Sequence, residues 1–232
     1  MGRTRRKTWR WRIAGLVLLI ALVGAVWGGW RALHWQPPRS EYPVQGVLVG
    51  EADGDVDFTA LRATGADFAY LEASRGASGR DADFPRNLDA VGAIGLPHGV
   101  VHAYDPCVPA ERQTANFVTI VPRDATTLPP VIALDKLASE CGDPVIEAAV
   151  ESELTTFINQ VENHVGQPVV LKIAPTFEAR YGIATRIERN LWLERDFVQP
   201  DYAGRPWTLW TANTRLMGEG NLTGLRWVVV QP

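Results

Sequence analysis

A chain of 232 residues is long enough for one substantial core, and its 46% hydrophobic and 21% charged content excludes wholesale disorder. The net charge of -3 is uneven: six of the 23 basic residues, and none of the 26 acidic ones, lie in the first twelve positions. The remainder holds 17 basic and 26 acidic residues, a charge of -9. Nucleic acid is therefore not expected as a partner, because phosphate binding needs clustered Lys and Arg.

An uncharged apolar run of 18 residues, 13–30, follows the basic segment 1–12. This is about the shortest length that crosses a bilayer core, and the tryptophans near both ends of the run suit the headgroup region. The positive-inside rule predicts a cytoplasmic tail at 1–12, a single pass through the inner membrane at 13–30 and a periplasmic or extracytoplasmic body. The alternative is a cleaved signal peptide, but the bulky residues after the run favour an uncleaved anchor. Residues 31–44, with three prolines, are expected to be a linker.

The two cysteines of the chain, Cys107 and Cys141, fit an exported protein. Their spacing matches no metal motif, and neither a metal nor another cofactor is expected. In an oxidising compartment they are expected to form one disulfide, which would contribute roughly 3–4 kcal/mol in the chain-entropy model. Two unpaired buried thiols are the alternative.

Beyond the linker, apolar runs alternate with amphipathic stretches, and these predict strands and helices. Strands are expected at 44–49, 68–72, 98–103, 130–135, 168–173, 191–194, 207–210 and 225–230. Helices are expected at 58–64, 84–94, 110–119 and 144–164, with a shorter one from Phe177. Five successive strand–helix units require parallel strands with right-handed crossovers. A count of eight strands favours a closed α/β barrel over a doubly wound sheet.

Several segments in order resemble the family 25 glycoside hydrolases, lysozymes (muramidases) that cut the glycan of peptidoglycan. The segments that carry the resemblance are GVLVGEADGDVDF (46–58), DFAYLEASRG (67–76), Asp81 with Phe84 and Asn87, GVVHAYDPC (99–107), LPPVIALD (128–135), GQPVVLKIAPTF (166–177), NLWLERDF (190–197) and GRPWTLW (204–210). The resemblance implies a (β/α)5(β)3 TIM-like barrel over 45–232, preceded by the transmembrane helix, with chemistry at the carboxyl ends of the strands.

The resemblance also implies acidic residues at those strand ends, and here the sequence departs from the family. The first-strand acid falls on Leu48, and the last falls on or near Thr223. The fourth-strand Asp-x-Glu keeps Asp135, but its Glu, the expected general acid, is Leu137. Since general acid catalysis contributes about 10²–10⁴-fold, the ordinary muramidase mechanism is not expected to operate.

Glu72 and Asp135 are the candidate catalytic residues. Each is expected at the carboxyl end of its strand, where the side chain would project into the barrel mouth. The alternative for Glu72 is a structural ion pair with Lys172 or Arg75. The remaining mouth candidates are expected to contact substrate, and a place in the core is the alternative for His102 and the tryptophans. They are Glu51, His102, Tyr104, Lys172, Trp192 and Trp210. A Cys107–Cys141 bridge would brace the rim by joining the loops after strands three and four.

Two functions are the main alternatives, and a purely structural membrane-tethered scaffold is a third. One is a membrane-anchored, lysozyme-like pseudoenzyme that binds peptidoglycan glycan strands or a cell-envelope protein, with impaired or lost hydrolysis. The other is an active peptidoglycan muramidase with relocated acids.

Overall fold

The computed structural model describes residues 3–218 and 224–232. The chain divides into two units, Met1–Trp35 and Gln36–Pro232. The first unit contains helix α1 (Arg3–Leu33). Within the described residues, its segment Trp11–Leu33 is the one helical stretch long and apolar enough to cross a membrane, and an N-terminal export signal has the same properties.

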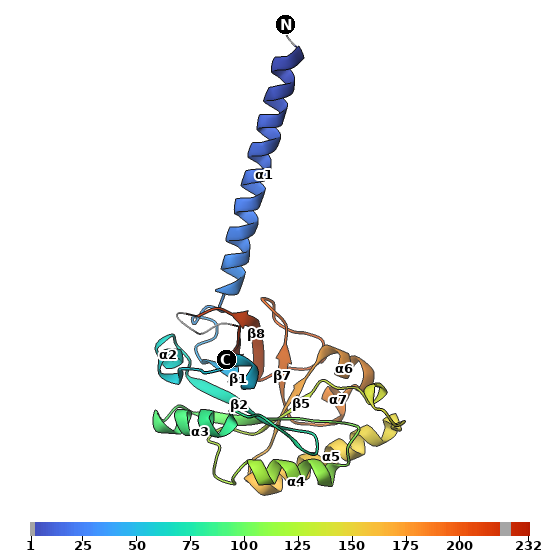
Figure 1. The fold of residues 1–232 in the computed structure, drawn as a ribbon. Helices are drawn as coiled ribbons and strands as arrows, with labels where there is room; N and C mark the ends of the chain where they lie inside the picture. The colour runs from blue at the N-terminus through green and yellow to red at the C-terminus, as the bar shows by residue number, and fades with distance from the viewer. Residues whose placement is uncertain (1–2, 219–223) are drawn as a thin grey trace. The chain divides into compact units, whose positions relative to one another are not determined.

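The second unit is a closed barrel with helices on its outside (Figure 1). Its strands and helices, in chain order, are β1 (Gln45–Val49), α2 (Phe58–Ala63), β2 (Phe68–Arg75), β3 (Gly79–Arg80), α3 (Phe84–Ala93), β4 (His98–Ala103), α4 (Ala110–Ile120), β5 (Val131–Leu134), α5 (Glu147–Val165), β6 (Val170–Ile173), α6 (Pro175–Tyr181), α7 (Ile183–Arg186), β7 (Asn190–Glu194), β8 (Leu209–Leu216) and β9 (Leu225–Val230). Short 3₁₀ turns lie at Glu51–Asp53 and Ala138–Glu140.

The strand order β1-β9-β8-β7-β6-β5-β4-β2 closes because β1 also pairs with β2. Neighbours from β1 and β2 round to β8 are parallel, whereas β9 is antiparallel to β8 and β1. Five strand–helix units followed by three strands confirm the predicted α/β barrel. The two-residue strand β3 was not predicted; it pairs with the end of β2 and forms a hairpin at the rim.

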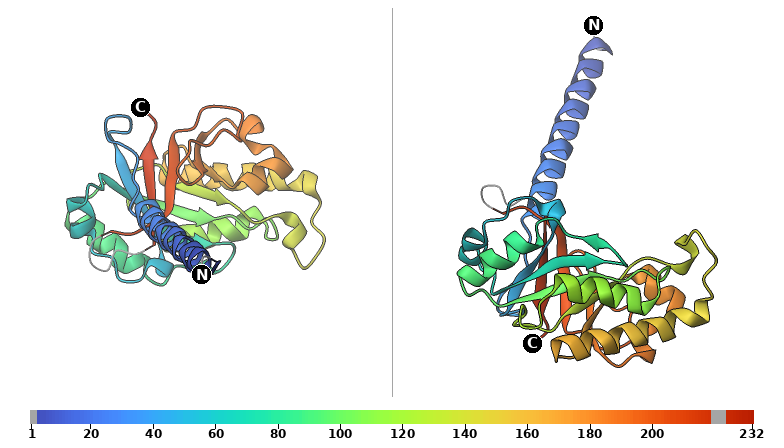
Figure 2. Two further views of the ribbon diagram at one scale, coloured as in Figure 1. Left: turned by 90° about the horizontal axis from the view of Figure 1, so that it is seen from above. Right: turned by 60° about the horizontal axis from the view of Figure 1, so that its bottom comes forward.

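Local chemistry explains several element boundaries. Helix α2 begins after Asp57, whose side chain accepts hydrogen bonds from the N–H groups of Thr59 and Ala60. Helix α5 ends at Gly166, whose φ of 76° is the left-handed conformation that glycine adopts without strain. Helices α4 and α5 lie side by side outside the barrel (Figure 2).

The barrel interior is filled by apolar side chains from every strand of the ring. They are Leu48, Phe68, Tyr70, Val101, Val131, Val170, Trp192, Leu209 and Val228. Because side chains alternate along a strand, the next inward residue toward the carboxyl end of each parallel strand reaches the mouth. This rule places Glu72 above Tyr70, Lys172 above Val170 and Glu194 above Trp192.

The segment expected as a linker is partly packed on the barrel from Pro37 onward. Pro37 and Tyr42 are buried, and the Gln45 side chain donates hydrogen bonds to the carbonyl oxygens of both. Tyr42 also stacks on Trp207 and meets the edge of Trp210. Residues 36–44 therefore belong to the compact barrel unit rather than to a free spacer.

Candidate functional site

The barrel mouth contains a cavity of about 320 Å³ at the carboxyl ends of the parallel strands. Its lining is mixed: apolar residues form the floor, and charged residues surround them. The lining residues are Leu48, Glu72, Ser74, Arg75, Asp81, Val101, Ala103, Ala133, Asp135, Lys172 and Arg226. The two predicted catalytic carboxylates, Glu72 and Asp135, thus line the same cavity.

Arg226 of β9 forms the centre of the largest charge network in this mouth. Its Nη1 donates to Glu72, and its Nη2 donates to Asp53 Oδ2 at 2.9 Å. The Asp53 side chain is only 7% exposed and also accepts the Gly50 N–H at 2.8 Å. Burial lowers the pKa of the Arg226 guanidinium, but the two carboxylates outweigh it and raise the pKa overall. Glu72 is therefore held in an ion pair with Arg226.

Glycine is required beside this network. A Cβ on Gly50 would lie 2.8 Å from Glu72 Cδ and 3.0 Å from Asp81 Oδ2. The backbone of the loop after β1 can therefore approach the two carboxylates only because position 50 has no side chain.

The predicted partners of Glu72 are engaged elsewhere. Lys172 Nζ lies 3.0 Å from Glu194 Oε2, and Arg75 Nη2 lies 3.0 Å from Glu51 Oε1. Glu72 does form an ion pair, as predicted, but its partner is Arg226 of β9. The expected pairing with Lys172 or Arg75 is wrong, because each has a nearer acid on a neighbouring segment.

Two acids next to the mouth have opposite environments. The Ala82 N–H and the Arg75 guanidinium lower the pKa of Glu51, which is exposed and outside the cavity lining. Asp81 is 4% exposed, and burial raises the pKa of its carboxyl despite hydrogen bonds from two backbone N–H groups. These donors are the N–H of Glu51 at 2.6 Å and the N–H of Asp83 at 2.9 Å. Both Asp81 oxygens therefore hold the loops in place.

Asp135 differs from the other mouth acids. It follows β5 directly, is exposed, and makes no hydrogen bond or ion pair with the residues that the structure describes. Leu137 stands two residues later, and its N–H donates to Glu140 Oε1 at 2.8 Å. Thr223, the other position matched to a family acid, lies outside the described residues.

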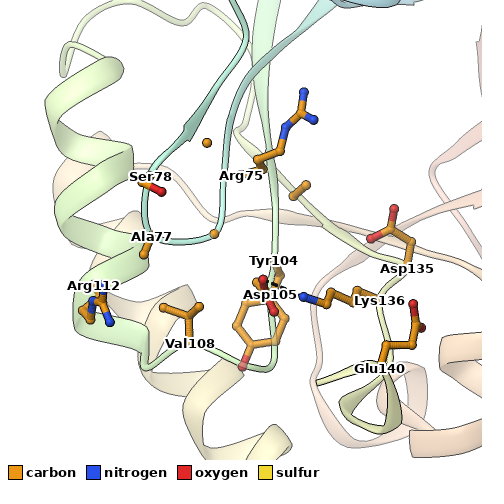
Figure 3. A pocket seen from close by; sticks show the side chains of 13 residues that line it. Arg75, Ala77, Ser78, Tyr104, Asp105, Val108, Arg112, Asp135, Lys136 and Glu140 are labelled. Atoms are coloured by element: carbon orange, nitrogen blue, oxygen red, sulfur yellow. Dashed lines mark hydrogen bonds and ion pairs between the residues drawn. The ribbon is translucent and has the colours of Figure 1, made fainter. Parts of the chain in front are cut away.

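A second, wider groove of about 730 Å³ adjoins the mouth and shares Arg75, Ala103 and Asp135 with it. Figure 3 shows Lys136 reaching toward Asp105 across its floor, where Nζ and Oδ2 are 2.8 Å apart. The predicted disulfide Cys107–Cys141 is present and joins the loops after β4 and β5. Asp105 lies near these two sulfurs, but sulfurs in a disulfide are not thiolate metal ligands.

Four residues expected to contact substrate are buried. His102 is 0% exposed and points away from the mouth, with Nδ1 2.8 Å from Ser74 Oγ and its ring against Phe157. Tyr104 is 2% exposed beneath the second groove, and its hydroxyl has no hydrogen-bond partner among the described residues.

The two tryptophans belong to the core. Trp192 is 0% exposed inside the barrel, and its indole N–H donates to Thr211 Oγ1 at 2.7 Å. Trp210 is 2% exposed on the outer side of β8, where its indole N–H donates to the Arg195 carbonyl. A ring without exposed surface cannot stack on a sugar, so the expected sugar contacts do not fit this structure.

Arg226, Asp53 and Glu194 are the charged residues that sequence reasoning missed. A signal for Arg226 existed: it stands in the apolar strand sequence LRWVVV, at the spacing of the inward-facing Val228. A charge at an inward position of a strand requires a partner of opposite sign.

Comparison with known proteins agrees with this architecture. The model of the glycosyl hydrolases family 25 matches residues 49–216. The chain belongs to glycosyl hydrolase family 25. A family 25 glycosyl hydrolase from Bacillus anthracis is 25% identical and has a TM-score of 0.76, with 86% of this chain and 93% of that chain covered.

More distant structures share the fold. The lysozyme from Streptomyces coelicolor is 19% identical with a TM-score of 0.68, over 82% of this chain and 92% of that one. A family 25 lysozyme from Aspergillus fumigatus is 18% identical with a TM-score of 0.66, over 82% and 94%. None of the curated proteins matches the chain significantly. Family 25 membership makes the mouth, rather than another surface, the candidate glycan site.

Proposed function

We propose that this family 25 protein binds the glycan of peptidoglycan at its barrel mouth and has little or no muramidase activity. One observation carries the proposal: the acids that border the mouth are engaged by cations or backbone N–H groups, and among the described residues Asp135 alone is not. The protein thus retains an open polar cavity, while the carboxylates that could take part in cleavage are paired with cations or backbone N–H groups.

The chemical reasoning starts from what glycoside hydrolysis requires. One carboxyl must donate a proton to the leaving oxygen, and a second carboxylate must stabilise or capture the sugar cation, or activate water. Leu137 cannot donate a proton. Glu72 is ion-paired with Arg226, so its carboxylate already has a partner in the mouth. Asp135 alone cannot fill both roles.

We further propose that α1 anchors the barrel to the inner membrane, with the N-terminus cytoplasmic and the barrel outside. The apolar length of Trp11–Leu33 and the six cations in the first twelve residues support this arrangement. Few residues separate the end of α1 at Leu33 from Pro37, the first residue buried on the barrel. A short tether would keep the barrel unit near the membrane that α1 crosses.

An active muramidase with relocated acids is the second candidate, and one observation favours it. Asp81 shares the mouth cavity with Asp135, and burial raises the pKa of its carboxyl, as a proton donor requires. We favour binding without cleavage because both Asp81 oxygens accept backbone hydrogen bonds.

The test uses the full chain in mild detergent with dye-labelled peptidoglycan sacculi. We expect the protein to sediment with the sacculi while dye release stays at the level of a protein-free blank. Asp135→Asn should weaken binding several-fold, whereas Asp124→Asn, at an exposed acid on the loop after α4, should not. Dye release that disappears in Asp81→Asn or Asp135→Asn would establish the muramidase instead. Failure to bind sacculi would refute the glycan-binding proposal.

A further inference from the structure

The second groove has walls from four separate segments of the chain. They are the hairpin before β3, the loop after β4, the first turn of α4 and the loop after β5 (Figure 3). Its volume of about 730 Å³ exceeds that of the mouth cavity, and the two spaces meet at Asp135. A ligand in the mouth could therefore continue into this groove.

The groove is held in one shape by contacts beneath its walls. The buried Asn116 side chain donates to the carbonyl oxygens of Gly76 and Gly79, each at 3.0 Å, and so fixes the hairpin. The disulfide Cys107–Cys141 ties the loop after β4 to the loop after β5. Charged groups on fixed walls bind a ligand without a large ordering cost.

Two pairs of charges on these walls compensate each other. The charges that are not paired with an opposite charge lie on opposite walls according to their sign. Arg75 is paired with Glu51, and Lys136 with Asp105. Arg112, in the first turn of α4, is exposed, and its guanidinium makes no hydrogen bond or ion pair with residues in the described ranges.

Across the groove, Asp135 and Glu140 lie on the opposite wall, with Lys136 and Asp105 between them and Arg112 (Figure 3). Glu140 is oriented by the Leu137 N–H, which it accepts at 2.8 Å. The groove thus has a positive side and a negative side.

We propose that this groove binds the peptide part of peptidoglycan, namely a short peptide with a free carboxylate facing Arg112 and a free amine facing Asp135 and Glu140. The proposal rests on the proposed glycan binding in the adjoining mouth. An uncharged sugar chain would offer none of these three side chains a partner of opposite charge. The peptides attached to the glycan carry both carboxylates and amines, so they match the two walls in sign.

The experiment measures binding of two ligands to the full chain in detergent by isothermal titration calorimetry. One is a peptidoglycan disaccharide bearing its peptide with a free lysine-type amine. The other is the same disaccharide without the peptide, with its lactyl carboxyl amidated so that the sugar carries no charge. We expect the wild type to bind the peptide-bearing ligand about tenfold more tightly. Arg112→Gln should remove most of this preference and leave the affinity for the plain disaccharide unchanged. Arg123→Gln, at an exposed cation beyond the other end of α4, is the matched control and should retain the preference.

The negative wall is tested by acetylating the amine of the peptide-bearing ligand. Acetylation should weaken binding to the wild type several-fold. The effect should be smaller in Glu140→Gln, which keeps Asp135 and whose amide oxygen can still accept the Leu137 N–H. Equal affinity of the wild type for the two disaccharides, or an unchanged preference in Arg112→Gln, would overturn this inference alone. Absence of binding to both ligands would overturn the proposed glycan binding and this inference with it.

Discussion

Replacing Arg226 with Met tests whether the mouth network is an ion-paired structural element. The substitution leaves Glu72 and Asp53 without their cation, and their side chains are 32% and 7% exposed. Orphaning a fully buried charge costs about 3–5 kcal/mol, and we take the lower half of that range because Glu72 is partly solvated. For a barrel of this size, about 3–4 kcal/mol lowers the melting temperature by roughly 6–16 °C. The change in melting temperature is measured by thermal unfolding of the full chain in detergent, monitored through the near-ultraviolet signal of the barrel tryptophans.

The control for Arg226→Met is Arg186→Met, which breaks the exposed pair of Arg186 with Glu151 on the barrel surface. This change should cost less than about 1 kcal/mol. The reasoning is refuted if Arg226→Met lowers the melting temperature no more than Arg186→Met does.

The remaining predictions concern the rim, the core and the loop after β1. Replacing Cys107 and Cys141 together by Ser should lower the free energy of unfolding by about 4 kcal/mol, since the bridge spans 34 positions, and an unchanged melting temperature would contradict this. Burial lowers the pKa of His102 to about 4, against a slight rise from its Gln113 hydrogen bond. In the unfolded chain His102 becomes protonated near pH 6.5, whereas in the folded chain it stays neutral down to about pH 4. The free energy of unfolding should therefore fall by up to about 3 kcal/mol between pH 6.5 and 4. His102→Gln should lack that part of the pH profile, and identical profiles would show that another group is responsible. Gly50→Ala should cost about 1–3 kcal/mol, because its Cβ meets Glu72 and Asp81. Gly92→Ala, in α3 with open space around it, should be neutral or slightly stabilising, and equal effects of the two would argue against the clash.

Much of the fold was predictable because its signals are local. The apolar period of α5 and the two-sided burial of the parallel strands can be read from short windows of sequence. Strand β8 was harder, and its predicted range, 207–210, was too short. The strand continues to Leu216 through Asn213 and Thr214, and its register against β9 is irregular there. These polar residues interrupt the apolar pattern from which a strand is predicted.

Site residues could be predicted only where a residue's position on its own strand determines whether its side chain reaches the mouth. Glu72 and Asp135 reach the mouth because each ends a barrel strand. The partner of Glu72 could not be found that way, since Arg226 lies 154 positions away and comes beside it only when β9 closes the ring. His102 was misplaced for the opposite reason: every residue from His98 to Val101 beside it is buried, so the sequence does not show which face of β4 points inward.

Under the proposed function, the charge pairing in the mouth is the reason that a cleft would bind glycan without cutting it. A general acid must hold a proton near neutral pH, which requires a carboxyl that is desolvated, turned toward substrate and free of cations. Glu72 and Glu194 have cations beside them, and Asp81 is desolvated but uses both oxygens on backbone N–H groups. Asp135 has no polar side-chain partner among the described residues and is exposed, so it suits hydrogen bonds from sugar hydroxyls rather than proton donation. A carboxylate restored at Leu137 would therefore face a mouth that still contains the Arg226 guanidinium, and that single change should not restore efficient hydrolysis.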